Sequence, residues 1–296
     1  MTVEEARKLY EKYKKELAWN NDHTNEEALT EITGFLLRKT GDPWYSMDLG
    51  GYYYGCEKYD LAQKYYELAY EQGDCSAALC LGYIWYYGRT GMVDYEKAFR
   101  YFNEAAEQGE DEAKRKIADM YKNGYYVPKD YERSCEIIES LYEAHKNDLY
   151  AFEQLPDLCT RLAEIRRKQG RIQEAVHLYL QAKKILPQRM KYTEFFGDVN
   201  VMDWLICHLY EISDPDYADL DLFDLLYVLK KPGRAVFHWN GNPYEMISVM
   251  EEGEYAVQFL GHWYRSMNDL FRKARLNGKP LYVCSDEIYD VEVRHG

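Results

Sequence analysis

Two adjacent residues, Cys207 and His208, are the first candidates for covalent chemistry, because a thiol beside an imidazole can act as a nucleophile with its own base. Neighbouring side chains of a helix point about 100° apart, however, so these two groups cannot share a proton. The sequence also lacks the spaced catalytic and phosphate-binding motifs H-E-x-x-H, C-x-x-C, G-x-S-x-G and G-x-x-x-x-G-K-[ST]. We therefore expect no catalytic residues.

Metal ligands are the next candidates. His238 and His262 each precede a tryptophan, and hairpins around them would set the two imidazoles on neighbouring strands. Two imidazoles are one ligand short of a catalytic zinc site, so the better interpretation is that both histidines are structural strand residues. The acidic run DPDYADLD (Asp214 to Asp221) lacks the central glycine and the final glutamate of a calcium loop, and it is better explained as a helix cap. We expect neither a metal nor another cofactor.

The sequence repeats itself, and the repeat determines which elements would hold a site. YYELAYEQG (Tyr65 to Gly73) and YFNEAAEQG (Tyr101 to Gly109) lie 36 residues apart, and LGYIWYYG (Leu81 to Gly88) recurs after the same interval as IADMYKNG (Ile117 to Gly124). Apolar residues recur in each copy at intervals of three to four residues, as in an amphipathic helix. Three copies are present, and each predicts a pair of helices.

Single residues at fixed places in the repeat support these helix pairs. Asp94 and Asp130 stand where a carboxylate would cap the second helix of a pair. The small residues Gly50, Gly82 and Ala118 recur where a larger side chain would hold the two helices apart, and aromatic residues are expected opposite them.

The pattern L-G-x-x-Y-x-x-G, followed by K-A-x-x-aromatic-Y-x-x-A-A-x-x-G, resembles the Sel1-like repeat (SLR) family of helical hairpins. A fourth unit, residues 156–187, is similar to the related tetratricopeptide repeat. The resemblance implies a mainly α protein, a right-handed α-α superhelix (a solenoid of helical hairpins) with a small C-terminal α+β domain. The predicted parts are a capping helical pair at residues 1–40, a solenoid at 41–190 (units about 43–75, 76–111, 112–147 and 156–189), a helical connector at 191–232 and the α+β domain at 233–296.

The connector and the C-terminal domain are predicted from local signals. Helices are expected over residues 198–213 and 219–231. Asn240-Gly241 and Glu252-Gly253 then separate short alternating runs, as turns of β-hairpins do. The remaining predictions are a helix from Ser266 to near Gly278 and two strands, LYVC at 281–284 and YDVEV at 289–293.

Composition limits the partners and the compartment. A net charge of −14 argues against nucleic acid, because phosphate binding depends on Lys and Arg that displace counterions. There is no run of about 18 apolar residues for a membrane span, and the charged start has no apolar signal region. The seven cysteines form no regular pairs, unlike those of the cysteine-rich SLR branch. We expect a cytoplasmic protein with reduced, mostly buried thiols and no membrane partner.

Charge is distributed unevenly along the chain. Residues 156–192 hold nine basic and three acidic residues, whereas residues 193–229 hold nine acidic residues and no basic one. One interpretation is an anion site in the basic segment. The other is that the two segments pack side by side and neutralise each other, because neighbouring elements in sequence usually touch in space.

Tyrosine occurs 31 times, more often than the repeat needs for its core. Its ring and hydroxyl suit recognition, although the rings could equally pack between repeats. In tetratricopeptide repeats the first helix of each hairpin lines the concave side. This resemblance implies a groove that runs from aromatic to basic, lined by Met47, Tyr54, Leu79, Tyr83, Tyr86, Tyr87, Arg115, Asp119, Lys122, Thr160, Glu164, Arg167 and Lys168.

These observations predict a non-enzymatic adaptor or scaffold that binds a protein or peptide segment in the concave groove of the solenoid. Two alternatives remain open. The chain could be an enzyme, either through the C-terminal domain or as a hydrolase with the penicillin-hydrolysing activity attributed to cysteine-rich SLR proteins. It could also bind RNA through residues 156–192, in which case affinity should collapse as salt rises.

Overall fold

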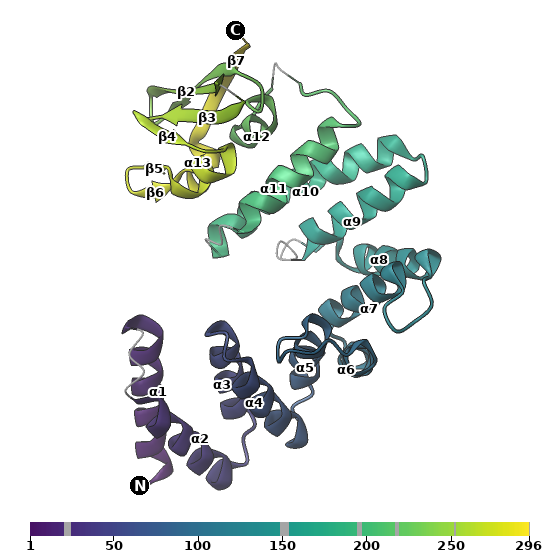
Figure 1. Cartoon of the computed structure of the whole chain (residues 1–296), viewed down its shortest axis with the longest axis vertical. Coiled ribbons are helices and arrows are strands. Elements are labelled where there is room, and N and C mark those ends of the chain that lie inside the picture. The colour runs from purple at the N-terminus through teal and green to yellow at the C-terminus, as the bar shows by residue number, and fades with distance from the viewer. Residues whose placement is uncertain (21–24, 149–153, 194–196, 217–218, 252, 296) are drawn as a thin grey trace. The chain divides into compact units, whose positions relative to one another are not determined.

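The computed structural model describes residues 1–20, 25–148, 154–193, 197–216, 219–251 and 253–295 (Figure 1). The chain forms two compact units, Met1–Ile137 and Ile138–Gly296. The fold is mainly α, with consecutive helices followed by a small C-terminal strand-rich domain. Within the described ranges, no helix is both long enough and apolar enough to cross a membrane.

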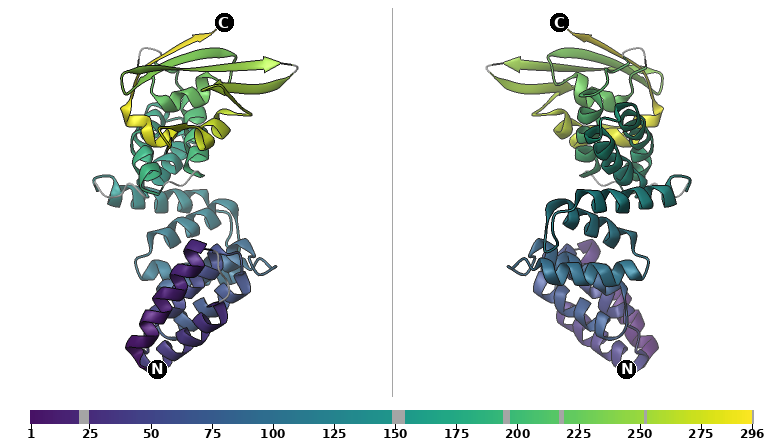
Figure 2. Two further views of the ribbon diagram at one scale, coloured as in Figure 1. Left: turned by 90° about the vertical axis from the view of Figure 1, so that its left-hand side faces the viewer. Right: turned by 90° about the vertical axis from the view of Figure 1, so that its right-hand side faces the viewer.

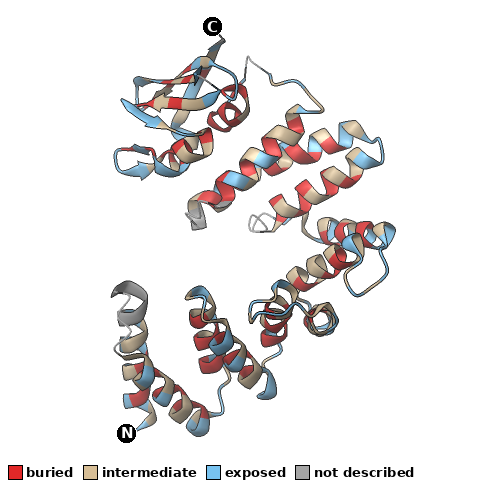
Figure 3. Ribbon diagram, in the orientation of Figure 1, coloured by how far each residue is buried: buried red, intermediate tan, exposed pale blue. Residues whose placement is uncertain are grey.

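The first unit is built from helical hairpins, as the repeat predicts. Helix α3 packs on α4 and α5 packs on α6, and each hairpin also packs on the next. Buried residues line the faces on which these helices meet (Figure 3). The helices are α1 (Val3–Asn20), α2 (Glu26–Thr40), α3 (Trp44–Gly55), α4 (Tyr59–Glu71), α5 (Ser76–Tyr87), α6 (Tyr95–Glu107), α7 (Asp111–Asn123) and α8 (Tyr131–His145), which continues into the second unit.

Local residues explain where these helices start, end and approach each other. Asp94 accepts the Lys97 backbone N–H at 2.9 Å, so the predicted cap is confirmed. Gly88 ends α5 with φ at 60°, in the left-handed region that favours glycine. A Cβ on Gly82 would lie 2.4 Å from the Phe102 ring, which confirms the expected pairing of a small residue with an aromatic one.

The second unit begins with the end of α8 and continues with more helices. Asp221 and Asp224 form a capping box, so the short helices start there and extend only to Val228. The predicted helix over 219–231 is therefore wrong in length. The helices are α9 (Leu155–Lys168), α10 (Ile172–Thr193), α11 (Gly197–Tyr210), η3 (Leu222–Asp224) and α12 (Leu225–Val228).

The strand-rich part is a five-stranded antiparallel sheet in the order β4-β3-β2-β1-β7. The Asn240-Gly241 turn has positive φ at both residues, as a tight hairpin requires, whereas Glu252 lies outside the described residues. Helix α13 contacts β3 and β4, and η4 contacts β7 (Figure 2). The elements are β1 (Gly233–Trp239), β2 (Asn242–Glu251), β3 (Glu254–Phe259), β4 (His262–Tyr264), α13 (Met267–Lys273), β5 (Arg275–Leu276), β6 (Lys279–Pro280), η4 (Leu281–Glu287) and β7 (Ile288–His295).

Two sequence predictions for this part are wrong. The helix from Ser266 ends at Lys273 rather than near Gly278, because Asn277 and Gly278 make a turn between β5 and β6. LYVC is not a strand but the start of the 3-10 helix η4, whose Leu281, Tyr282 and Cys284 are buried. The strand predicted at YDVEV is confirmed as part of β7.

Candidate functional site

The structure separates Cys207 from His208. The Cys207 Sγ lies 2.8 Å from the Lys230 Nζ, whereas the His208 Nδ1 lies 2.8 Å from the Trp204 carbonyl oxygen. Burial raises the pKa of the Cys207 thiol despite the opposing effect of Lys230, so the thiolate that attacks as a nucleophile is disfavoured. The pair thus has no shared proton path.

The two strand histidines also lie apart. His238 is on β1 and His262 is on β4, and the strands β2 and β3 lie between them in the sheet. The expectation of imidazoles on neighbouring strands is therefore wrong. Within the described part of the chain, no group of three or more His, Cys, Asp or Glu residues is placed to hold a metal ion.

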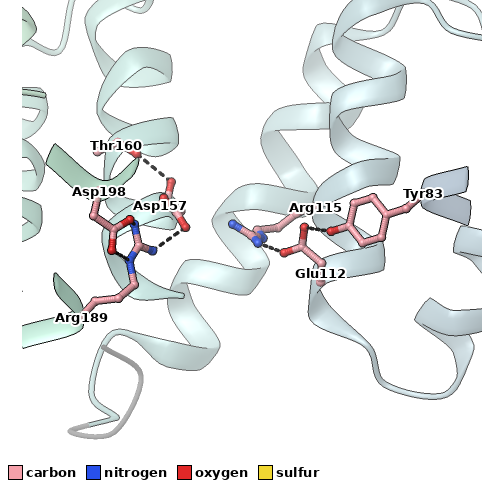
Figure 4. Close-up of polar contacts among 7 residues, drawn as sticks. All are labelled: Tyr83, Glu112, Arg115, Asp157, Thr160, Arg189 and Asp198. Carbon is pink, nitrogen blue, oxygen red and sulfur yellow. Dashed lines mark hydrogen bonds and ion pairs between the residues drawn. The ribbon is translucent and has the colours of Figure 1, made fainter. Parts of the chain in front are cut away.

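The basic segment is joined to the acidic one by several ion pairs. Lys183 contacts Asp221 at 2.9 Å and Asp224 at 2.7 Å, joining α10 to the short helices that follow α11. Arg189 contacts Asp198 at 3.0 Å and a second carboxylate on α9 at 2.8 Å (Figure 4). The interpretation that these segments pack and pair with each other is confirmed.

The predicted wall residues of the fourth repeat lie in the second unit. Thr160 is 6% exposed and donates its hydroxyl hydrogen to the Asp157 carbonyl, so its assignment to an open wall is wrong. Arg167 forms an ion pair with Glu211 at 2.8 Å. Glu164 is half-buried and Lys168 is exposed, and both have interaction partners.

Several predicted wall residues of the first unit contact other residues of the protein. Met47 and Leu79 are partly buried and pack against the cores of the unit. On α7, Arg115 pairs with Glu112, and Asp119 and Lys122 also have interaction partners. None of these three α7 side chains is without a partner.

Three tyrosines of α5 form a ring cluster. Tyr83 and Tyr87, four residues apart on one helix face, stack at 5.9 Å with an interplanar angle of 4°. Tyr86 meets Tyr87 edge-on at 4.9 Å and also contacts Phe102 and Tyr125. Tyr83 and Tyr86 are half-buried, whereas Tyr87 is 45% exposed. The cluster is thus held by the contacts of its half-buried rings, and Tyr87 is its exposed member.

A half-buried carboxylate, that of Glu112, holds Tyr83 in place. The Tyr83 hydroxyl donates to Glu112, which also pairs with Arg115 (Figure 4). Burial raises the pKa of Tyr83, so the ring remains a neutral phenol. Glu112 is therefore occupied by two partners within α5 and α7.

Two cations flank the cluster. The Lys116 Nζ on α7 lies 5.3 Å from the Tyr87 ring centroid and 2.8 Å from the Tyr87 hydroxyl. The Arg89 guanidinium, directly after α5, lies 5.1 Å from the Tyr87 ring and 5.1 Å from the Tyr59 ring, and its Nε donates to the Tyr54 hydroxyl at 3.2 Å. All three distances from a cation to a ring centroid are within cation–π range.

We call this set the tyrosine surface. Sequence reasoning identified four of its members and missed the two cations and the ring from α4. The missed residues lie within the repeats but not at the first-helix positions assigned to the wall: Tyr59 begins the second helix α4, Arg89 lies in the loop after α5, and Lys116 is next to Arg115 on α7. The tyrosine surface consists of Tyr54, Tyr59, Tyr83, Tyr86, Tyr87, Arg89 and Lys116.

Comparison with known proteins identifies the repeat. The sequence profile of the Sel1 repeat matches residues 47–74, 76–110 and 111–139. No curated protein matches the chain. Repeats of this kind generally act as protein–protein interaction modules and are typically non-catalytic scaffolds.

Several solved structures are similar to the chain. One is a Sel1 repeat protein from Oxalobacter formigenes, with 23% identity and a TM-score of 0.46, covering 61% of this chain and 66% of that one. Another is c5321, a protective antigen of uropathogenic Escherichia coli strains with an SLR fold (19% identity, TM-score 0.48), covering 71% of this chain and 49% of that one. A third is pilF of Pseudomonas aeruginosa (16% identity, TM-score 0.43), covering 71% of this chain and 92% of that one.

Proposed function

We propose, starting from the three Sel1 repeats that the chain contains, that this protein is a non-enzymatic adaptor that binds a segment of another polypeptide. The binding site is the tyrosine surface of the first unit. The observation that carries the proposal is Tyr87, a large ring that is 45% exposed and yet held by two rings and two cations.

The physical reason is the low cost of using such a ring for binding. A side chain that is already fixed loses little conformational freedom when a partner covers it. Tyrosine also combines a wide apolar face with a hydroxyl, and it is enriched among the residues that dominate interface energies. Tyr83 and Tyr86 serve mainly to hold Tyr87 in place, since both are half-buried.

No specific observation favours either alternative function, RNA binding or hydrolysis. RNA binding through residues 156–192 is disfavoured because Lys183 and Arg189 are already paired with carboxylates. For a hydrolase, the Cys207 thiol has a raised pKa and no imidazole beside it. We therefore keep the adaptor as the proposed function.

The proposal extends to a cytoplasmic location. All seven cysteines lie in described parts of the chain and are present as thiols rather than disulfides, which fits a reducing compartment. Fractionation of the native cell would contradict this assignment if the protein were recovered with secreted proteins.

The function is tested with peptides selected on the full chain from a random library displayed on phage. Binding of a selected peptide is measured by fluorescence polarisation for the wild type and for Tyr87→Ala. Truncation of a central interface ring costs about 2 kcal/mol, so Kd should rise about 30-fold. Because the ring is half exposed, the melting temperature should change little.

Tyr70→Ala is the matched control. Tyr70 lies on α4, is 36% exposed, and contacts Tyr101 and Glu104 on α6 rather than the tyrosine surface. This variant should bind as the wild type does. If Tyr87→Ala binds every selected peptide with unchanged affinity, the tyrosine surface is not the site and the proposal fails.

A further inference from the structure

We propose that the segment bound by the tyrosine surface is acidic, with its carboxylates held by Lys116 and Arg89. This inference rests on the proposed function and names the chemistry of the partner. Both cations lie close to Tyr87, and each has hydrogen-bond donors that no carboxylate of the described residues uses.

Lys116 has donors to spare. An ammonium group carries three N–H donors, and among described residues its hydrogen-bond partner is the Tyr87 hydroxyl at 2.8 Å. The Nζ otherwise lies over rings, at 5.3 Å from the Tyr83 centroid and 5.5 Å from the Tyr86 centroid. The rings hold the charge in place without supplying the strong acceptors that an ammonium prefers.

Arg89 is held in the same way. Its guanidinium has five N–H donors, of which Nε is used by the Tyr54 hydroxyl. The guanidinium lies over the rings of Tyr54, Tyr59 and Tyr87. The Tyr54 hydroxyl and neighbouring phenols raise the Arg89 pKa, and no carboxylate contributes to that shift. Its two terminal nitrogens carry the N–H donors that can bind both oxygens of a carboxylate.

Some other cations of the first unit are paired with carboxylates, whereas Lys116 and Arg89 are not paired with any in the described part of the chain. Lys58 pairs with Glu26 at 2.7 Å and Lys114 with Asp111 at 2.6 Å. Lys116 and Arg89 contact no carboxylate among the described residues. On a chain with a net charge of −14, carboxylates are plentiful, so two cations kept apart from them form a local positive patch.

The geometry also sets the spacing of the acidic residues. Both cations flank one ring, Tyr87. Side chains two residues apart in an extended segment project to the same side, about 7 Å from each other. Because both cations lie within 5.3 Å of the centroid of one ring, acidic residues close together in the partner, such as Asp or Glu at positions i and i+2, are the expected match. Glu112 is occupied by Tyr83 and Arg115 and does not repel such a segment from an open position.

The test uses the same phage-displayed random library on the wild type and on a double variant, Arg89→Glu with Lys116→Glu. Peptides selected on the wild type should be enriched in Asp and Glu, and their binding should weaken by about tenfold or more in the double variant. Peptides selected on the double variant should lose that enrichment. Thermal melts of both proteins establish that the fold is kept.

Lys64→Glu is the matched control. Lys64 is exposed on α4 and lies 5.8 Å from the Tyr65 ring, so it is also a cation beside a tyrosine but away from the tyrosine surface. The substitution changes the net charge by the same amount per site and should leave binding unchanged. Equal weakening in this variant would show a general effect of charge and would overturn the inference.

A measurement on the wild type alone removes any dependence on variant folding. The tightest selected peptide is compared with a version in which every Asp and Glu is replaced by Asn and Gln. The amide version should bind about tenfold more weakly at low salt, and the difference should shrink as sodium chloride is raised. Equal affinity of the two peptides would overturn the inference.

The results also separate the two proposals. If selected peptides need Tyr87 but not their acidic residues, the adaptor function stands and the acidic partner is wrong. If they bind independently of Tyr87, both proposals fail. Selection of peptides rich in Lys and Arg would likewise contradict an acidic partner.

Discussion

Gly50 and Gly51 are adjacent in α3 but differ in what surrounds them. A Cβ on Gly50 would lie 2.5 Å from the ring of Tyr66, which is 4% exposed on α4. A Cβ on Gly51 would meet its nearest atom, the Tyr66 hydroxyl oxygen, at 3.9 Å. The two positions thus test the close approach of the helices within one hairpin.

We predict opposite effects for the two alanine substitutions. Gly50→Ala should destabilise the protein by about 1–3 kcal/mol, because a buried ring must move to admit the methyl group. Gly51→Ala should be neutral or should stabilise by up to about 1 kcal/mol, because alanine favours a helix more than glycine does. Thermal melts of both variants check this. Equal melting temperatures would show that the Tyr66 ring can move away from residue 50 without destabilising the protein.

At the scale of single residues, the tyrosines of the candidate site could be predicted from the sequence, but the cations beside them could not. Tyr83, Tyr86 and Tyr87 were predicted because they exceed the needs of the repeat core. Arg89 and Lys116 were not, because their contacts depend on where several helices lie relative to one another. A single sequence gives the type and spacing of a residue but not the side chains from other elements that surround it.

The helices of the second unit are joined by buried charge. Arg189 on α10 contacts Asp157 on α9 at 2.8 Å and Asp198 on α11 at 3.0 Å. The arginine side chain is 11% exposed and that of Asp198 is 8% exposed. Removing the arginine would leave a buried carboxylate without a counter-charge. This destabilises a fold by more than the intact ion pair stabilises it.

Arg189→Met should therefore destabilise the protein by about 3 kcal/mol, with a fall of several degrees in melting temperature. Arg171→Met is the control, because Arg171 and Glu174 form an exposed pair at 2.6 Å within α10 and its preceding turn. Exposed pairs contribute about 0–1 kcal/mol, so this melt should hardly change. A comparable loss in both variants would contradict a special role for the buried cluster.

The elements themselves were predictable to different degrees. Helix pairs of the first unit follow from a strict repeat, with local signals such as Asp94 and Gly88 at their ends. The start of η4 at Leu281 was mistaken for a strand, because a short apolar run does not distinguish a buried 3-10 helix from a buried strand. Tertiary packing decided that choice.

At the scale of the whole molecule, the chain has two compact units. The first carries the Sel1 repeats and the tyrosine surface. In the second, the sheet is tied to the helices, since Asn268 on α13 donates to Asp203 on α11 and the Tyr255 hydroxyl donates to the Leu229 carbonyl at 2.7 Å. Charge pairing and burial in this unit stabilise its fold, whereas the proposed binding site lies in the first unit.

The central claim, that a polypeptide is bound on the tyrosine surface, is tested most directly by hydrogen–deuterium exchange of the full chain with and without a selected peptide. We predict slower exchange in α5 and α7 and in the residues around Arg89, because a bound segment shields and steadies these helices. Exchange in α6 and in the second unit should stay the same. Protection confined to the β1–β4 strands, with none in α5 or α7, would contradict the account.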